Sequence, residues 1–287
     1  MEHTEGACKE MEWNSSSDPN SHVNALPTED TTLDPSYLIA LIRRLMPSEA
    51  QTALLTTEPT ASKEAKSEEE EDDKVTAGCI LWDITTIAAQ AEFLGNNLLP
   101  QVALCNLQNS PSERLQEVML GIMANLSVQP SGAAKLAEVE FRQEILSVFH
   151  DSQSPPVLTE VLRLFRMACS STCTAAALAW ARDLLQAVHL QRVGWIIANS
   201  LSSGIVERAA DVISALATKQ REMAVPELVY QAGLLTQLTD GLQTHTQAAA
   251  SAHDNMEGEG ESMAAVDGLL RALEVGTTVL TQATLVT

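Results

Sequence analysis

The residue types that bind metals occur in only one suggestive pair. Cys169 and Cys173 are four residues apart, a spacing that places two thiols on one face of a helix. None of the six histidines has another histidine four residues away, and no carboxylate pattern resembles a zinc ligand set. For these two cysteines we favour a purely structural role, as two small core or half-buried side chains. The sequence therefore predicts no metal and no cofactor.

Motifs that carry out catalysis are missing from the sequence. It contains no glycine-rich phosphate loop, no Gly-x-Ser-x-Gly elbow and no cysteine or serine in a setting that would activate it as a nucleophile. We therefore expect a protein that is not an enzyme and has no small-molecule substrate.

Composition and charge narrow the choice of partners. Hydrophobic residues make up 45% of the 287 residues and aromatic residues only 3%, which favours helices packed on helices. The net charge is −21 and no basic patch is evident, so we expect binding to neither nucleic acid nor an anionic membrane. The longest uncharged apolar run, 174–181, is far too short to span a bilayer. We favour the interpretation that the acidic charge keeps the protein soluble. The alternative is that it attracts a basic partner.

The cysteine count and the amino terminus indicate the compartment. There are five cysteines, an odd number that does not suggest a disulfide framework. Residues 1–20 are polar and acidic and lack the apolar stretch of a secretory signal. We expect a protein of the nucleus, the cytoplasm or both.

Shifts in composition divide the chain into four parts. Residues 1–32 are polar and without periodicity, which predicts a disordered amino-terminal arm. Residues 33–47 have the pattern of a short amphipathic helix, and residues 48–76 that of a low-complexity linker ending in six consecutive acidic residues. Residues 77–285 read as a helical domain with a loop at 246–262. Its first helix is predicted as one piece, 80–94.

An internal repeat organises the helical domain. Laying 115–127 over 158–170 aligns apolar residues at a spacing of 43, and a further step of 48 leads to 206–219. A fourth copy is expected around Leu269. The aligned apolar positions are Leu115, Val118, Ile122 and Leu126, then Leu158, Val161, Phe165 and Cys169, then Ala209, Ile213 and Ala217. Such a period predicts an all-α fold, an α-solenoid of about four repeats.

The first unit carries a more specific resemblance. Its second helix begins with a proline at Pro100, a Ser-Pro loop follows, and its third helix ends in Asn-Leu-Ser at 125–127, which resembles an armadillo repeat. The order of the elements 79–84, 93–94, 121–125 and 151–156 resembles the serum-amyloid-A-like protein 1 (synoviocyte-proliferation-associated) family. That resemblance implies an armadillo-like, nuclear protein without known catalytic activity, linked by name to proliferation control. The chain is shorter than the family at its carboxyl end.

The repeat register predicts a protein-binding stripe. In an armadillo stack the third helices form the concave face, and residues four apart on them point the same way. Here the stripe would pass from polar to apolar side chains and be flanked by arginines, which suits a helix or an extended peptide of a partner. Its members are Glu117, Asn125, Arg163, Leu164, Arg166, Arg208, Val212 and Leu216. The alternative is a register shifted by one residue, in which the apolar members are buried.

Two tryptophans invite separate interpretations. Trp195 and Asn199 have the spacing with which importin-type armadillo proteins clamp a basic peptide, but the repeat places them on a second helix, and this disfavours recognition of nuclear signals. Trp82 is interpreted either as a docking anchor or, preferably, as a cap over the open end of the core.

Taken as a whole, the sequence predicts a non-enzymatic scaffold that binds a protein of unknown identity through the concave face. The alternative is a structural subunit or chaperone-like adaptor in which the helix 37–45 folds back and controls access to that face.

Overall fold

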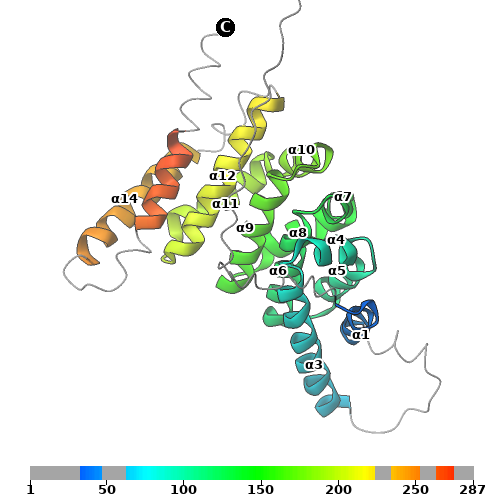
Figure 1. The fold of residues 1–287 in the computed structure, drawn as a ribbon. Coiled ribbons are helices and arrows are strands. Elements are labelled where there is room, and N and C mark those ends of the chain that lie inside the picture. Colours follow the sequence, from blue (N-terminus) through cyan, green and yellow to red (C-terminus); the bar gives the residue numbers. More distant parts are fainter. Residues whose placement is uncertain (1–32, 47–62, 224–233, 253–262, 275–287) are drawn as a thin grey trace, which may run out of the picture. The chain divides into compact units, whose positions relative to one another are not determined.

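The computed structural model describes residues 33–46, 63–223, 234–252 and 263–274, and all regular structure in them is helical. Figure 1 shows the order of the helices along the chain. They are α1 (Pro35–Leu45), α3 (Lys63–Ile84), α4 (Ala88–Gly95), α5 (Leu99–Asn109), α6 (Glu113–Leu126), α7 (Pro130–Leu136), α8 (Val139–Asp151), α9 (Pro155–Cys169), α10 (Thr174–Leu184), α11 (Ala187–Asn199), α12 (Ser203–Met223), α14 (Leu234–Ala252) and residues 263–274. The predicted arm, 1–32, lies outside the described residues.

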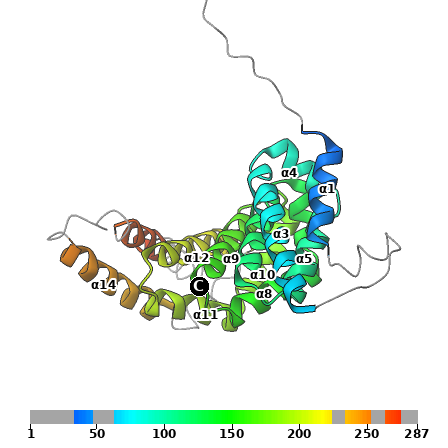
Figure 2. The same cartoon turned by 90° about the horizontal axis from the view of Figure 1, so that it is seen from below.

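The helices form repeated units of a short first helix, a second helix and a third helix. Three units are complete: α4–α6, α7–α9 and α10–α12. Second helices contact second helices, as in α1 with α5 and α5 with α8, and third helices contact third helices, as in α6 with α9 and α9 with α12 (Figures 1 and 2). The all-α solenoid predicted from the sequence is confirmed.

The core follows the predicted repeat. Val118, Ile122 and Leu126 of α6 are buried between neighbouring helices, and the aligned residues of α9 and α12 are buried too. Leu269, in the expected fourth copy, is also buried. Because α6 and α9 each contact a third helix on both sides, they present two apolar flanks rather than one.

Local sequence signals explain where several helices begin. The side chain of Ser112 accepts a hydrogen bond from the backbone N–H of Leu115 and caps α6. Proline stands in the first turn of α5, α7 and α9, where its missing N–H has no helical partner to lose. These signals fix the short connections between units.

The acidic segment differs from the prediction. Residues 63–76, assigned to the low-complexity linker 48–76, form the first half of α3. Lys74 contacts Glu70 one turn earlier at 2.8 Å, and Asp73 pairs with Arg44 of α1, so part of the like-charge repulsion is offset.

Two further boundaries were predicted incorrectly. The helix expected at 80–94 is broken, because Thr85 and Thr86 donate their hydroxyls to the carbonyls of Trp82 and Asp83 and end α3. Residues 246–252, expected in a loop, are the last two turns of α14, while 253–262 lie outside the described residues.

Helix α1 docks as a second helix. Leu38, Leu41, Ile42 and Leu45 are buried against α3 and α5. The side-chain amide of Asn106 donates a hydrogen bond of 2.9 Å to the carbonyl oxygen of Leu45. Without it, this carbonyl at the end of α1 would lack a partner. Helices α1 and α3 take the places of the second and third helix in a unit that precedes α4–α6. Helix α1 therefore packs beside the other second helices rather than over the third helices.

Candidate protein-binding face

The apolar part of the predicted stripe is not available to a partner. Leu164, Val212 and Leu216 each have a relative exposure of 0%. They face neighbouring third helices, which cover both flanks of α9 and α12. These three residues are core, as in the alternative interpretation, and their assignment to a binding stripe was wrong; the repeat register itself holds, because Ile122, Phe165 and Ile213 are buried too.

The polar members of the stripe do reach the surface of the third helices. Arg166 is exposed, and Glu117, Asn125, Arg163 and Arg208 are half-buried. We call the exposed sides of α3, α6, α9, α12 and residues 263–274 the third-helix face. Glu117 pairs with Arg114 on its own helix at 2.7 Å. Asn125 and Arg163 belong to one cluster of polar contacts and Arg166 belongs to another.

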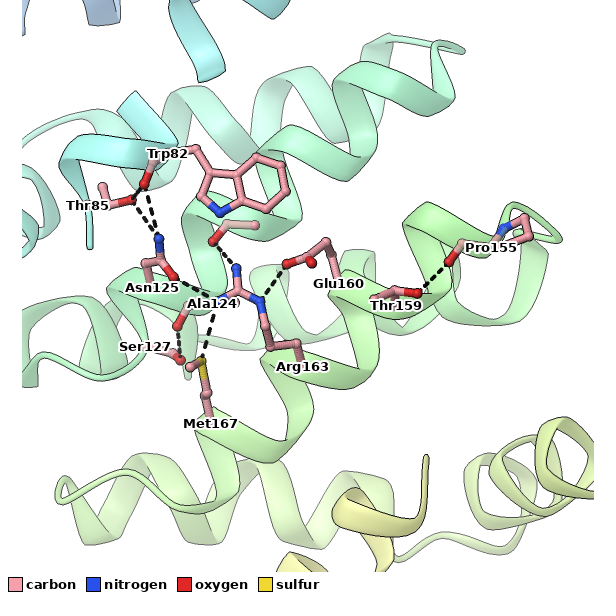
Figure 3. A network of polar contacts seen from close by, with 11 residues as sticks. Trp82, Thr85, Ala124, Asn125, Ser127, Pro155, Thr159, Glu160, Arg163 and Met167 are labelled. Carbon is pink, nitrogen blue, oxygen red and sulfur yellow. Dashed lines mark hydrogen bonds and ion pairs between the residues drawn. The ribbon is translucent and has the colours of Figure 1, made fainter. Parts of the chain in front are cut away.

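The first cluster is centred on Arg163 and is closed (Figure 3). Its guanidinium donates to Glu160 at 2.6 Å, to the side-chain oxygen of Asn125 at 2.8 Å and to the carbonyl of Gly121 at 2.9 Å. Glu160 is only 8% exposed, so its charge is compensated inside the structure. The ring of Trp82 lies 6.0 Å from the guanidinium carbon.

Asn125 links this cluster to the carboxyl-terminal end of α3. Its amide nitrogen donates to the carbonyl of Trp82 and to the hydroxyl of Thr85, both at 3.1 Å. With Arg163 on its oxygen, the side chain bridges α3, α6 and α9. The structure therefore brings two predicted site residues together, but in a clasp between helices rather than in an open ligand site.

Sequence reasoning missed the partners that Trp82 and Arg163 find on α6. Gly121 stands where the aligned repeats carry Leu164 and Val212, and a glycine inside a helix requires a reason. That reason is the indole of Trp82, which occupies the space of the missing side chain. Trp82 therefore packs from α3 onto α6, the third helix of the next unit.

The second cluster is open and lies on α9, α12 and residues 263–274. Asp211 contacts Arg166 at 3.4 Å and Arg271 at 3.9 Å, with all three side chains partly exposed. A hollow of about 190 Å³ adjoins Arg166. Its lining residues are Val128, Arg166, Met167, Ser170, Ser171 and Thr172.

A larger hollow, of about 400 Å³, lies between α12 and residues 263–274. It combines carboxylates with an exposed aliphatic side chain, Leu270, which is 49% accessible. Its lining residues are Glu207, Ala264, Asp267, Leu270, Arg271 and Glu274. Apolar anchors surrounded by charged groups are the surface chemistry with which proteins bind other proteins.

The remaining candidates lie away from the third-helix face. Trp195 and Asn199 are on α11, a second helix, as predicted; Trp195 is 47% exposed and stacks with Arg192 at 5.0 Å. Cys169 ends α9 while Cys173 precedes α10, so the two thiols do not share a helix. Among the described residues, no three His, Cys, Asp or Glu side chains gather as a metal site.

Within the described part of the chain, none of the helices has the length and apolar character needed to traverse a bilayer.

Comparison with known proteins places this architecture among armadillo-like folds. No protein-family model matches the chain. Protein SAAL1 of Mus musculus is 25% identical over 167 residues, which cover 57% of this chain and 35% of that protein. The matched region thus spans about a third of SAAL1.

Solved structures agree on the fold. The designed armadillo repeat protein YIII(Dq)4CqI superimposes with a TM-score of 0.54 at 14% identity, covering 83% of this chain and 99% of the design. A second design, YIII(Dq.V1)4CPAF in complex with peptide (KR)4, gives a TM-score of 0.53 at 15% identity over the same share of each chain. The chain therefore has an armadillo-like fold and is similar to part of Protein SAAL1.

Proposed function

We propose that the protein is a non-enzymatic scaffold that binds a polypeptide segment of another protein through the open part of its third-helix face. The observation that carries this proposal is the pair of hollows beside the Asp211 cluster, which contain apolar anchors within a charged rim. A role in proliferation control, and residence in the nucleus or the cytoplasm, belong to the same proposal and rest on the resemblance to SAAL1.

The two kinds of side chain on this face would have different effects on binding. Val128 and Leu270 are 46% and 49% exposed, and burying them against a partner would supply most of the affinity. The charged groups around them would mainly set the association rate and its dependence on salt. Because the chain carries a net charge of −21, a basic partner segment would be favoured.

Peptide binding by an armadillo stack has a precedent among the structural relatives. The design superimposed above was solved with the peptide (KR)4. Its likeness to this chain supports a polypeptide segment as the ligand but does not carry the peptide sequence across.

The test compares matched substitutions on and off the face. A partner recovered from cell extract by co-purification is purified, and its affinity is measured for Arg166→Glu and Leu270→Ser. The controls make the same changes on other helices: Arg182→Glu on α10 and Val188→Ser on α11, both exposed.

Leu270→Ser should weaken binding at least about fivefold, because removing an anchor commonly costs more than about 1 kcal/mol. Arg166→Glu makes the face more acidic, so it should chiefly speed association with a basic partner segment, and less so at high salt. Both controls should bind like the original chain, and circular dichroism should show the same helical content in all four. Equal loss in variants and controls, or loss in none, would move the binding surface elsewhere.

A further inference from the structure

Two Ser-Pro steps occupy the same place in successive units. Ser110-Pro111 lies in the connection between α5 and α6, and Ser154-Pro155 in the connection between α8 and α9. A serine followed by proline is the local sequence that proline-directed kinases require, and the proline biases the serine toward an extended backbone. The two steps therefore offer the same motif in two structural settings.

The settings differ in access. Ser154 is only 6% exposed and is the N-cap residue of α9, with Pro155 already in the first turn. Ser110 instead follows the end of α5 with an extended backbone (φ −106°, ψ 127°), and Pro111 and Ser112 separate it from α6. Its neighbours Asn109 and Pro111 are exposed. Ser110 is half-buried and its Oγ accepts a hydrogen bond from the backbone N–H of Ser112 at 3.2 Å, so it is the more accessible of the two serines.

Ser110 lines a hollow that also holds acidic side chains. This hollow, of about 190 Å³, is also lined by Glu70, Glu71 and Lys74 of α3. The ammonium of Lys74 is already engaged by Glu70 at 2.8 Å. A phosphate of about −1.5 to −2 charge would therefore meet two carboxylates and one shared ammonium, and the net interaction is repulsive.

We propose that Ser110 is a phosphorylation site for a proline-directed serine kinase, and that the phosphate loosens the acidic first half of α3 from the α5–α6 connection. In the transfer step the Oγ atom of Ser110 attacks the γ-phosphorus of kinase-bound ATP. The new O–P bond forms as the bond from that phosphorus to the β–γ bridging oxygen breaks. ADP leaves, and the hydroxyl proton passes to the base of the kinase.

The first experiment tests the site. The full chain is incubated with a mitogen-activated protein kinase, which is proline-directed, and Mg-ATP. Phosphorylated residues are then mapped by mass spectrometry. Ser110 should be modified and Ser154 should not, whereas the urea-unfolded chain, digested to peptides, should accept phosphate at both. Equal modification of both serines in the folded chain, or none at Ser110, overturns the assignment.

The second experiment tests the consequence. Hydrogen exchange of residues 69–76 should become faster in the phosphorylated chain, while that of α9 is unchanged. Ser110→Ala treated with the kinase is the control, and Glu70→Gln/Glu71→Gln should reduce the effect by removing the repelling charges. Slower exchange after phosphorylation would mean that the phosphate pairs with Lys74 and would overturn the loosening.

Discussion

The indole of Trp82 fills the space that a side chain at position 121 would need. A methyl group on Gly121 would overlap the six-membered ring of Trp82, which packs from α3 onto α6. The backbone carbonyl of Gly121 accepts a hydrogen bond from Arg163 of α9. One glycine therefore sets the spacing of three third helices.

Gly121→Ala should destabilise the protein, because the indole must leave its position in a closely packed interface. We expect a loss of about 1–3 kcal/mol in the free energy of unfolding, measured by chemical denaturation. Gly204→Ala is the matched control, since no atom lies within 4 Å of its added methyl group. The control should be neutral or slightly stabilising; an equal loss in both variants would mean that the Trp82 contact does not limit the packing.

Ile122→Ala should also destabilise the fold. Ile122 is fully buried on α6, and its truncation leaves a cavity between third helices, so we expect a loss of about 2–5 kcal/mol. Val188→Ala removes a comparable aliphatic group from a side chain that is 54% exposed and should change stability by less than about 0.5 kcal/mol. Thermal or urea unfolding of both variants measures the difference, and similar midpoints would contradict the burial of Ile122.

Leu164→Glu should unfold the protein rather than only abolish partner binding. The side chain is fully buried among third helices, and a carboxylate there would have no ionic partner. Loss of helical signal in circular dichroism, or a large drop in the melting temperature, is the expected result. A variant that keeps its helical content and melting temperature would show that Leu164 reaches the surface.

The contact between His150 and His189 predicts a pH dependence of stability. The Nε2 atom of His150 lies 2.7 Å from the Nδ1 atom of His189, between α8 and α11. Burial lowers the pKa of both imidazoles, and Arg192 beside His150 and the mutual contact at His189 lower it further. Asp151 and Asp183 act in the opposite direction but do not reverse the shift.

Because the folded state binds protons less readily than the unfolded state, stability should fall as the pH drops below about 6.5, the ordinary pKa of histidine. Urea unfolding between neutral and mildly acidic pH measures this slope. His189→Asn removes the pair and should flatten the slope in that window. An unchanged slope in the variant would assign the pH dependence to other groups.

Periodicity in the sequence was sufficient to predict the core. The repeat at Val118, Ile122 and Leu126 reports which residues face neighbouring helices, and burial of those residues depends on little else. The same periodicity did not separate the two apolar flanks of a third helix from its exposed side. Leu164 and Val212 were therefore placed on a surface that neighbouring helices cover.

The clasp around Arg163 was harder to predict because it depends on contacts between units. Its hydrogen bonds join residues about forty positions apart, and no local spacing encodes them. Gly121 was the available signal, since it replaces a leucine or valine of the aligned repeats. The acidic half of α3 was missed for a related reason: its helix is supported by Arg44, which lies in another element.

The hydrogen bond from Asn106 to the carbonyl of Leu45 has a practical consequence for dissecting the chain. A fragment cut at residue 77, where composition suggests that the helical domain begins, would lose α1 and half of α3. It would then expose the apolar side of α5 and leave the buried amide of Asn106 with one of its two acceptors, the carbonyl of Val102. Such a fragment should aggregate or express poorly. A fragment that begins at Leu33 keeps α1 packed against α3 and α5, so the apolar side of α5 stays covered.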